Sequence, residues 1–252
     1  MNLIEGTYGM CIIKDCLEYM QSLPDKSIDL IFTDTLWGHD YQDHAQKPMG
    51  INQKAHKQDR VPYNDQWNPE FHINWFLEAQ RVSKAQIICV GRKHKQWWIE
   101  SFQPIDWVTL YYKNGQGSTK ISHYSAKMDY YCFGDEQWWK EHKFHRDVYE
   151  TYIHNGFLRD EEYKYNHPSP KDYKTWAEMI QDLKPSLVYD PFMGSGCLAE
   201  VGESLGIKWI GTELNLSDKG LPAGYDLDIL HRIQLGQDRN KKNKRKKITA
   251  FL

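Results

Sequence analysis

Short apolar runs alternate with amphipathic segments along most of the chain. A continuous apolar run bounded by turn residues predicts a buried strand, whereas apolar positions three and four residues apart predict a helix that covers a sheet. Strands are predicted at residues 9–14, 28–33, 86–91, 107–112, 128–133, 186–189 and 208–212. Helices are predicted at residues 17–23, 71–82, 93–102, 173–183, 197–205 and about 223–235. This alternation predicts an α/β fold with a doubly wound, mostly parallel sheet of seven strands.

Two stretches, residues 38–70 and 134–166, lack such a pattern, and we predict a single domain over residues 1–238 into which they are inserted. The first is long for a loop within a compact domain, and loops of that length are usually functional. Both stretches combine cations, which suit phosphates, with aromatic rings, which suit bases. These residues include Lys47, Lys54, Lys57, Arg60, Trp138, Trp139, Lys140, Lys143 and Arg146. We expect both stretches to contact a target, although core packing is the more usual role of any single tryptophan.

The composition indicates an ordinary soluble domain. Of the 252 residues, 40% are hydrophobic and 26% are charged, which is normal for one α/β domain. The chain has no run of about 18 apolar residues and no charged leader with an apolar core, so we expect a cytoplasmic protein with no membrane partner. The five cysteines form no C-x-x-C pair and the 11 histidines show no ligand spacing, which argues against a metal site.

The charge is unevenly distributed, although the net charge is only −2. Residues 239–252 contain seven cations and no acid: Arg239, Lys241, Lys242, Lys244, Arg245, Lys246 and Lys247. The other 25 of the 32 basic residues stand against 34 acidic ones, so the rest of the chain has a net charge of −9. A basic tail on an acidic body suits nucleic acid. A disordered, solubilising C-terminus accounts for the same charges equally well.

The stretch from Asp190 to Cys197, Asp-Pro-Phe-Met-Gly-Ser-Gly-Cys, joins a predicted strand to a predicted helix through a glycine-rich turn. Glycine lets the backbone bend sharply and approach a ligand closely, and the start of the helix offers N–H groups to it. Glu213 ends the next strand, where nucleotide-binding folds hold ribose hydroxyls. A lone Gly-x-Gly is a weak signal, but this combination predicts a site for a nucleotide-like cofactor.

A second polar stretch, Asp34-Thr35-Leu36-Trp37, directly follows the predicted strand at residues 28–33. Ligands of doubly wound sheets bind beyond the carboxyl ends of the strands. We therefore expect this stretch and the turn after Asp190 to line one crevice.

Read together, these motifs resemble those of S-adenosylmethionine-dependent DNA amino-methyltransferases in the permuted order called the β class. That family has an Asp/Asn-Pro-Pro-aromatic catalytic motif first and an Asp-Pro-Phe-x-Gly-Ser-Gly cofactor motif last. The resemblance covers most of the chain, namely residues 15–18, 23–34, 78–82, 167–171 and 205–214 in addition to the turn. It implies a class I, Rossmann-like methyltransferase fold with circularly permuted motifs, S-adenosylmethionine as cofactor, and a role in DNA methylation such as restriction-modification.

The resemblance also implies roles for individual residues. The catalytic residues would be Asp34, Thr35, Leu36 and Trp37, with Trp37 stacked on a base flipped out of duplex DNA. Asp15 would contact the cofactor adenine and Glu213 its ribose. The remaining cofactor residues would be Asp190, Pro191, Phe192, Gly194, Ser195 and Gly196 of the turn, with Ser169 or Lys171 near the methionine carboxylate.

The catalytic motif departs from the family, because Thr35 and Leu36 replace two prolines. The amino nitrogen of adenine is a poor nucleophile, and acceptors for its N–H groups, the Asp34 carboxylate and the Thr35 carbonyl, would localise its lone pair. Both groups are retained, whereas the rigidity of proline is lost. An aspartate in first position favours adenine in DNA, and cytosine N4 or RNA adenine are the alternative targets.

A catalytically weakened or inactive nucleic-acid-binding relative, or a partner subunit, is the alternative to an enzyme. The stretch that we assign to target recognition is short. A second subunit, as in a homodimer, a short target site or low specificity would each account for that.

Overall fold

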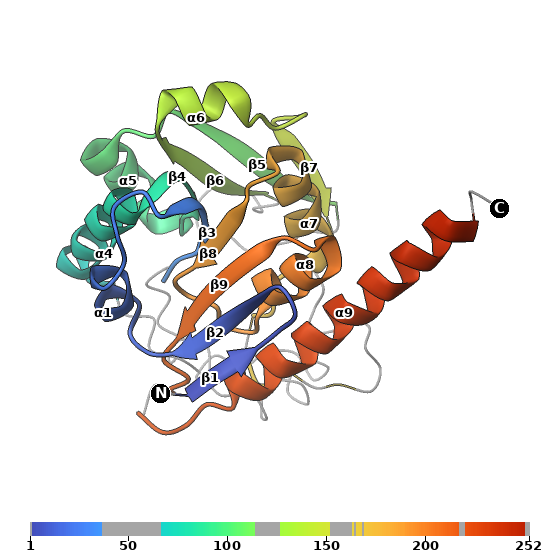
Figure 1. Cartoon of the computed structure of the whole chain (residues 1–252). Coiled ribbons are helices and arrows are strands. Elements are labelled where there is room, and N and C mark those ends of the chain that lie inside the picture. The colour runs from blue at the N-terminus through green and yellow to red at the C-terminus, as the bar shows by residue number, and fades with distance from the viewer. Residues whose placement is uncertain are drawn as a thin grey trace, which may run out of the picture.

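The computed structural model describes residues 2–36, 67–113, 127–151, 163, 165–167, 169–216 and 220–249. The described residues form one nine-stranded sheet in the order β1-β2-β9-β8-β3-β4-β6-β5-β7 (Figure 1). The strands are β1 (Asn2–Glu5), β2 (Gly9–Ile13), β3 (Ile28–Asp34), β4 (Ser83–Cys89), β5 (Asp106–Tyr112), β6 (Lys127–Gly134), β7 (Val148–Thr151), β8 (Leu187–Asp190) and β9 (Lys208–Glu213). The helices of more than one turn are α1 (Cys16–Gln21), α4 (Pro69–Val82), α5 (Lys95–Phe102), α6 (Glu136–Glu141), α7 (Tyr173–Leu183), α8 (Cys197–Leu205) and α9 (Tyr225–Thr249).

The centre of the sheet is parallel, as the apolar runs predict. Five central strands pair in parallel, each with the next, in the order β2, β9, β8, β3 and β4. Strand β6 is antiparallel to β4 and β5, and β1 is antiparallel to β2. The carboxyl ends of β3, β8 and β9 therefore meet at one edge of the sheet, which is where doubly wound folds bind ligands.

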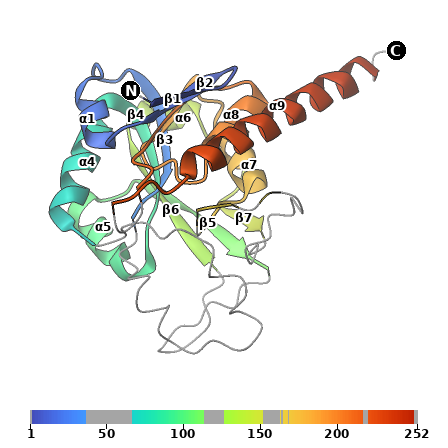
Figure 2. The ribbon, with the colours of Figure 1, turned by 90° about the horizontal axis from the view of Figure 1, so that it is seen from below.

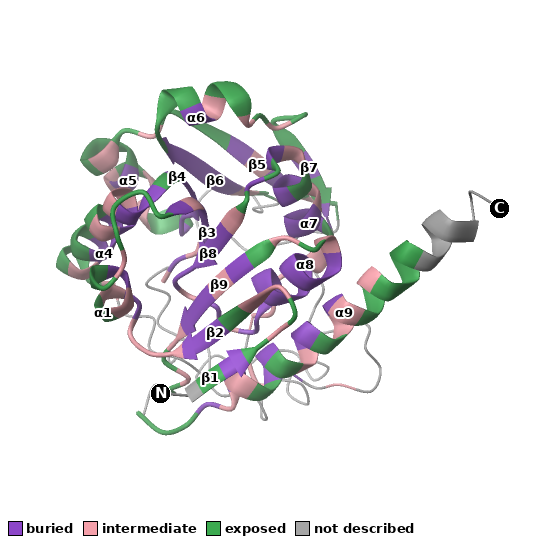
Figure 3. Cartoon of the chain, in the orientation of Figure 1, coloured by how far each residue is buried: buried purple, intermediate pink, exposed green. Residues whose placement is uncertain are grey.

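Helices cover both faces of the sheet and give it two hydrophobic cores (Figures 1 and 3). Along β3, Leu30 and Phe32 face the core with α7, α8 and α9, whereas Ile31 faces the core with α1, α4 and α5. Successive side chains of a strand point to opposite faces, so a strand buried on both sides must be apolar throughout. This arrangement confirms the prediction of a doubly wound sheet.

The sheet has nine strands where the sequence predicts seven, because short strands are added at both edges. Strand β1 pairs with β2, and β7 pairs in parallel with β5. Strand β7 and helix α6 belong to the stretch 134–166, which we expected to be an insertion. Tyr149 of β7 is fully buried, as Trp138 of α6 nearly is, so this part of the stretch belongs to the core.

The C-terminal helix is longer than predicted. Helix α9 continues from Tyr225 to Thr249, so the basic residues that we expected in a tail lie on its last turns. Figure 2 shows that this end projects away from the sheet. Helix α4 begins at Pro69 after an Asn68 cap, and most of the predicted loop 38–70 lies outside the described residues. None of the described helices is long and apolar enough to cross a membrane.

Candidate active site

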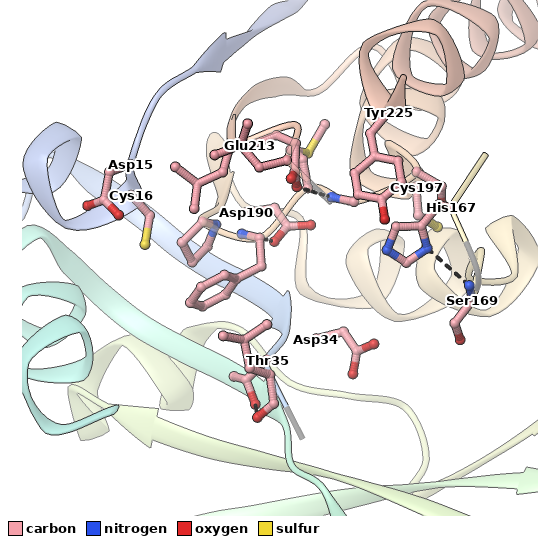
Figure 4. A pocket seen from close by; sticks show the side chains of 18 of the residues that line it. Asp15, Cys16, Asp34, Thr35, His167, Ser169, Asp190, Cys197, Glu213 and Tyr225 are labelled. Carbon is pink, nitrogen blue, oxygen red and sulfur yellow. Dashed lines mark hydrogen bonds between the residues drawn. The ribbon is translucent and has the colours of Figure 1, made fainter. Parts of the chain in front are cut away.

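A cavity of about 600 Å³ opens at the carboxyl ends of β3, β8 and β9 (Figure 4). Its size is typical of small-molecule and cofactor pockets. The predicted site residues that line it are Asp15, Asp34, Thr35, Leu36, Ser169, Lys171, Asp190, Pro191, Phe192, Gly194, Ser195 and Glu213. Gly196 caps α8 beside the cavity, and Trp37 lies outside the described residues. The structure thus brings the two predicted motifs to one crevice, as expected.

The glycine-rich turn needs glycine at two positions. Gly194 has φ +50° and Gly196 has φ +82°, conformations that side chains with a Cβ rarely adopt. A Cβ on Gly194 would lie 2.9 Å from Nε2 of His167, and one on Gly196 would lie 2.9 Å from Cα of Ile229. The backbone of the turn therefore passes close to His167 and to Ile229 of α9. The turn forms part of the cavity wall.

Glu213 binds this turn to the end of β9. Its Oε2 accepts a hydrogen bond from the N–H of Gly194 at 2.7 Å, and its Oε1 accepts one from the N–H of Asn215 at 3.0 Å. Burial raises the pKa of its carboxyl group, while these two N–H donors act in the opposite direction. Each carboxylate oxygen can accept a further bond, so Glu213 can brace the turn and bind hydroxyls of a ligand.

Asp190 has a bracing role that the motif alone does not reveal. It is 1% exposed, and its Oδ1 accepts hydrogen bonds from Oγ1 of Thr33 at 2.7 Å and from the N–H of Phe192 at 3.0 Å. Burial raises the pKa of Asp190 to about 7, with a smaller contribution from the carboxylates of Asp34 and Glu213. Asp190 thereby joins β8 to β3 beneath the cavity.

Asp15 and Phe192, two further residues of the predicted cofactor site, also line the cavity. Asp15 caps α1 by accepting hydrogen bonds from the N–H groups of Leu17 at 2.9 Å and Glu18 at 3.1 Å. Phe192 packs edge-on against Trp75 and Phe71 of α4, with ring centroids 5.2 and 6.2 Å apart. This apolar wall suits a flat ring.

Asp34, the first residue of the predicted catalytic motif, forms an ion pair with Lys171. The Nζ of Lys171 lies 2.5 Å from Oδ2 of Asp34 and 3.4 Å from Oγ of Ser169. Burial alone would lower the pKa of Lys171, but the neighbouring Asp34 carboxylate raises it above its ordinary value. The resemblance places Lys171 near the methionine carboxylate, which stays a prediction, whereas the structure places its ammonium group on Asp34.

Sequence reasoning missed the part that α9 has in the site. Asp228 of α9 accepts hydrogen bonds from the N–H groups of Asn166 at 3.0 Å and His167 at 2.8 Å. Arg232, one helical turn further on, donates to the carbonyl of Lys171 at 2.8 Å. The periodicity of α9 predicts an amphipathic helix but carries no signal that its buried polar residues hold the segment 166–171.

Comparison with known proteins agrees with the fold. No family model matches the chain. It is 24% identical over 276 aligned positions to the type II methyltransferase M.HinfI of Haemophilus influenzae, covering 86% of this chain and 70% of that one. Its structure is similar to that of PvuII DNA methyltransferase (cytosine-N4-specific), with a TM-score of 0.56, 17% identity and coverage of 93% and 97%. It is also similar to M1.HpyAVI in its SAM complex, with a TM-score of 0.53, 17% identity and coverage of 88% and 98%.

The chain therefore has the class I methyltransferase fold, with a cavity at the carboxyl edge of its sheet. In sequence it is similar to a type II methyltransferase, and in fold it is similar to a cytosine-N4-specific DNA methyltransferase.

The cavity fits S-adenosylmethionine as its cofactor. The left-handed glycine turn presents backbone where a Cβ would collide, and Phe192 offers an aromatic face. The carboxyl groups of Asp15 and Glu213 line the same cavity and can accept hydrogen bonds from a ligand.

Proposed function

We propose that this protein transfers a methyl group from S-adenosylmethionine to the exocyclic amino group of adenine in duplex DNA. The observation that carries the proposal is that Asp34 and the glycine-rich turn line one cavity at the carboxyl edge of the sheet. The bound cofactor supplies an activated methyl group on a sulfonium centre. The task of the chain is therefore to hold the cofactor, admit a flipped base and make its amino nitrogen nucleophilic.

Asp34 is proposed to do the last of these. Its carboxylate accepts a hydrogen bond from the amino group, and the Thr35 carbonyl accepts the other. Both acceptors draw the nitrogen lone pair out of the ring and stabilise the positive charge that develops on nitrogen during transfer. Stacking of Trp37 on the flipped base remains a prediction, because Trp37 lies outside the described residues.

The cofactor is proposed to lie along the turn. The N–H of Ser195 faces its methionine end, Glu213 accepts from its ribose hydroxyls, and Asp15 and Phe192 hold its adenine. A merely structural role is the alternative for Asp15, because it caps α1.

Cytosine N4 is the second candidate target, because its amino group needs the same acceptors and a structural neighbour is described as cytosine-N4-specific. An aspartate at position 34 supports adenine by resemblance. Mass spectrometry of nucleosides from treated DNA and RNA separates the targets, since N6-methyladenine, N4-methylcytosine and their ribose forms differ in mass or retention.

The test of the proposal is methyl transfer from labelled S-adenosylmethionine to duplex DNA. Asp34→Ala should abolish transfer and leave cofactor affinity unchanged, whereas Asp106→Asn, an exposed change at the start of β5, should affect neither. Absence of transfer to any DNA by the folded, cofactor-bound native protein would refute the proposal.

The non-catalytic alternative is tested with a double variant, Thr35→Pro with Leu36→Pro. If only this variant transfers methyl groups, the native chain is a nucleic-acid-binding relative. Under our proposal the native chain is active without it.

A further inference from the structure

The ion pair between Lys171 and Asp34 joins two segments that are far apart in the sequence. Asp34 ends β3, whereas Lys171 lies just before α7, and each side chain is only 18% exposed. We propose that Lys171 is a positioning residue that holds the Asp34 carboxylate in the orientation in which it accepts a hydrogen bond from the substrate amino group. This inference rests on the proposed methyl transfer.

The backbone of Lys171 is fixed by buried groups of α9. The Arg232 guanidinium, 1% exposed, donates to the Lys171 carbonyl at 2.8 Å and is itself paired with the buried Glu200 of α8. Asp228 holds the other end of the same segment through the N–H of His167 at 2.8 Å. With its backbone held by α9, Lys171 can place its ammonium group at one site.

Charge explains why Asp34 needs this partner. A carboxylate removed from water is costly unless a cation or hydrogen-bond donors lie beside it. Among the described residues, Asp34 interacts electrostatically with the Cys89 thiol of β4, the Tyr112 and Tyr130 hydroxyls of β5 and β6, and the Asp190 carboxyl of β8. Burial raises the pKa of Cys89, Tyr112 and Tyr130, so these groups are neutral at neutral pH. The ammonium group of Lys171 brings a positive charge to within 2.5 Å of Oδ2 of Asp34.

Protonation of Asp34 would defeat the proposed chemistry. A protonated carboxyl has an O–H that donates a hydrogen bond, and one of its oxygens loses its acceptor role. The amino group would then lose an acceptor that draws its lone pair out of the ring. Because Lys171 engages Oδ2, it also fixes the rotation of the carboxylate, and such alignment matters for transfer.

Two roles of Lys171 make different predictions. A ligand of the methionine carboxylate would act mainly on cofactor affinity. A positioning residue would act on the transfer step from the cofactor-bound state, and a residue that keeps the ion pair would recover part of that step.

The experiment compares Lys171→Met and Lys171→Arg with the native protein. Lys174→Met is the matched control, because Lys174 is three residues away and its side chain is 79% exposed. Cofactor binding is measured by calorimetry, and transfer is measured in single turnovers at saturating cofactor and DNA. The NMR chemical shift of the Asp34 carboxyl carbon at a fixed pH gives a third readout, which reports the contact with Lys171 and does not depend on turnover.

For Lys171→Met we expect cofactor affinity close to native and transfer slowed about a hundredfold by misalignment. The Asp34 carboxyl resonance should move from its native position, because the ammonium group beside Oδ2 is lost. Lys171→Arg keeps the charge, so it should recover part of the rate. Should the methionine variant fail to fold, Lys171→Gln provides the same neutral replacement.

Weaker cofactor binding with unchanged transfer from the bound state would overturn the inference, as would an unchanged carboxyl resonance of Asp34. If the native protein methylates no nucleic acid while the resonance still moves in Lys171→Met, the proposed function fails and the ion pair remains. The two failures are therefore distinguishable.

Discussion

Thr35 is bound twice to the carbonyl oxygen of Cys89. The backbone N–H of Thr35 donates to it at 3.4 Å, and the hydroxyl Oγ1 donates to it at 3.2 Å. Cys89 ends β4 directly beside Asp34, so this pair of bonds extends the contact between β3 and β4 by one residue. Proline, which the related motif has at this position, has neither donor. The hydrogen bonds of Thr35 therefore restrain the proposed catalytic motif by another means.

Removal of the Thr35 hydroxyl should loosen the motif without disturbing the cofactor site. Thr35→Val keeps the N–H bond and the shape of the side chain but loses the bond from Oγ1. A hydrogen bond of this kind contributes about 1 kcal/mol, so we expect about a fivefold slower transfer step. Single-turnover methylation measures it, with cofactor affinity unchanged. Thr35→Ser retains the hydroxyl and should remain close to native; an equal loss in both variants would contradict the role of the hydroxyl.

Gly194→Ala should weaken cofactor binding. The new Cβ would meet Nε2 of His167 at 2.9 Å, and the left-handed backbone, at φ +50°, costs about 1 kcal/mol for a residue other than glycine. The strain shifts the turn and His167, both of which line the cavity. We expect calorimetry to show at least about a fivefold weaker affinity for S-adenosylmethionine.

The control for this prediction is Gly206→Ala. Gly206 ends α8 at φ +73°, where the nearest atom to a Cβ is 3.5 Å away on Tyr8. The variant carries similar backbone strain without a change at the cavity, so it should lose stability but retain affinity. Equal affinities of both glycine variants would show that the turn tolerates a side chain.

The central strands were predictable because burial on both faces requires an unbroken apolar run, as in β3. The edge strands were not. In β7, only alternate residues are buried, and the strand has four residues, so its pattern resembles that of the aromatic-rich stretch around it. The end of α9 was placed too early because the apolar positions of its first turns stop at Leu235. Polar contacts hold the next turn, where Arg239 pairs with Glu200 and Asn240 donates to the carbonyl of Glu203, and Lys and Arg favour a helix beyond it.

The two halves of the site were predictable because each motif is local and follows a strand. The contacts that hold it together were not. Lys171, Asp228 and Arg232 act on residues that the fold brings near, and the sequence places no mark on either partner of the Asp34–Lys171 pair that identifies the other. The bracing role of Asp190 could not be predicted either, because it depends on a hydrogen bond from Thr33 of another strand.

Asp190 should make stability fall as the pH rises through the neutral range. Its pKa is raised from 3.8 to about 7 by burial, so the folded state holds a proton that the unfolded state releases. Stability from this group is complete below about pH 3.8 and is lost as the pH approaches 7. The shift corresponds to a few kcal/mol, on the order of 1.4 per pH unit.

Asp190→Asn removes this dependence and keeps Oδ1 as acceptor for Thr33 and Phe192. The variant should be the more stable protein above pH 7 and show a flatter profile of unfolding free energy against pH, measured by denaturant titration. The native slope persisting in Asp190→Asn would assign the pH dependence to another group.

The basic end of α9 is expected to contact DNA phosphates, which again rests on DNA as the substrate. Lys242 and Lys244 are exposed on the part of α9 that projects from the domain, whereas Arg239 is paired with Glu200 and Lys241 lies 3.4 Å from Asp238 (Figure 2). Neutralising a phosphate releases a counterion, which makes binding salt-dependent with a slope of about 0.9 per contact. Replacing both lysines with glutamine keeps the helix and should weaken binding.

The measurement is the slope of log affinity against log salt concentration for duplex DNA. The double variant should lower its magnitude by up to about 2, from two lost contacts. Lys184 and Lys208 flank the amino ends of β8 and β9, at the edge opposite the cavity, and their double glutamine variant makes the same charge change. That control should retain the native slope. The lower slope of the Lys242 and Lys244 variant would then be due to the position of these lysines and not to the change in net charge. An equal slope in all three proteins would favour a solubilising role for the basic turns of α9.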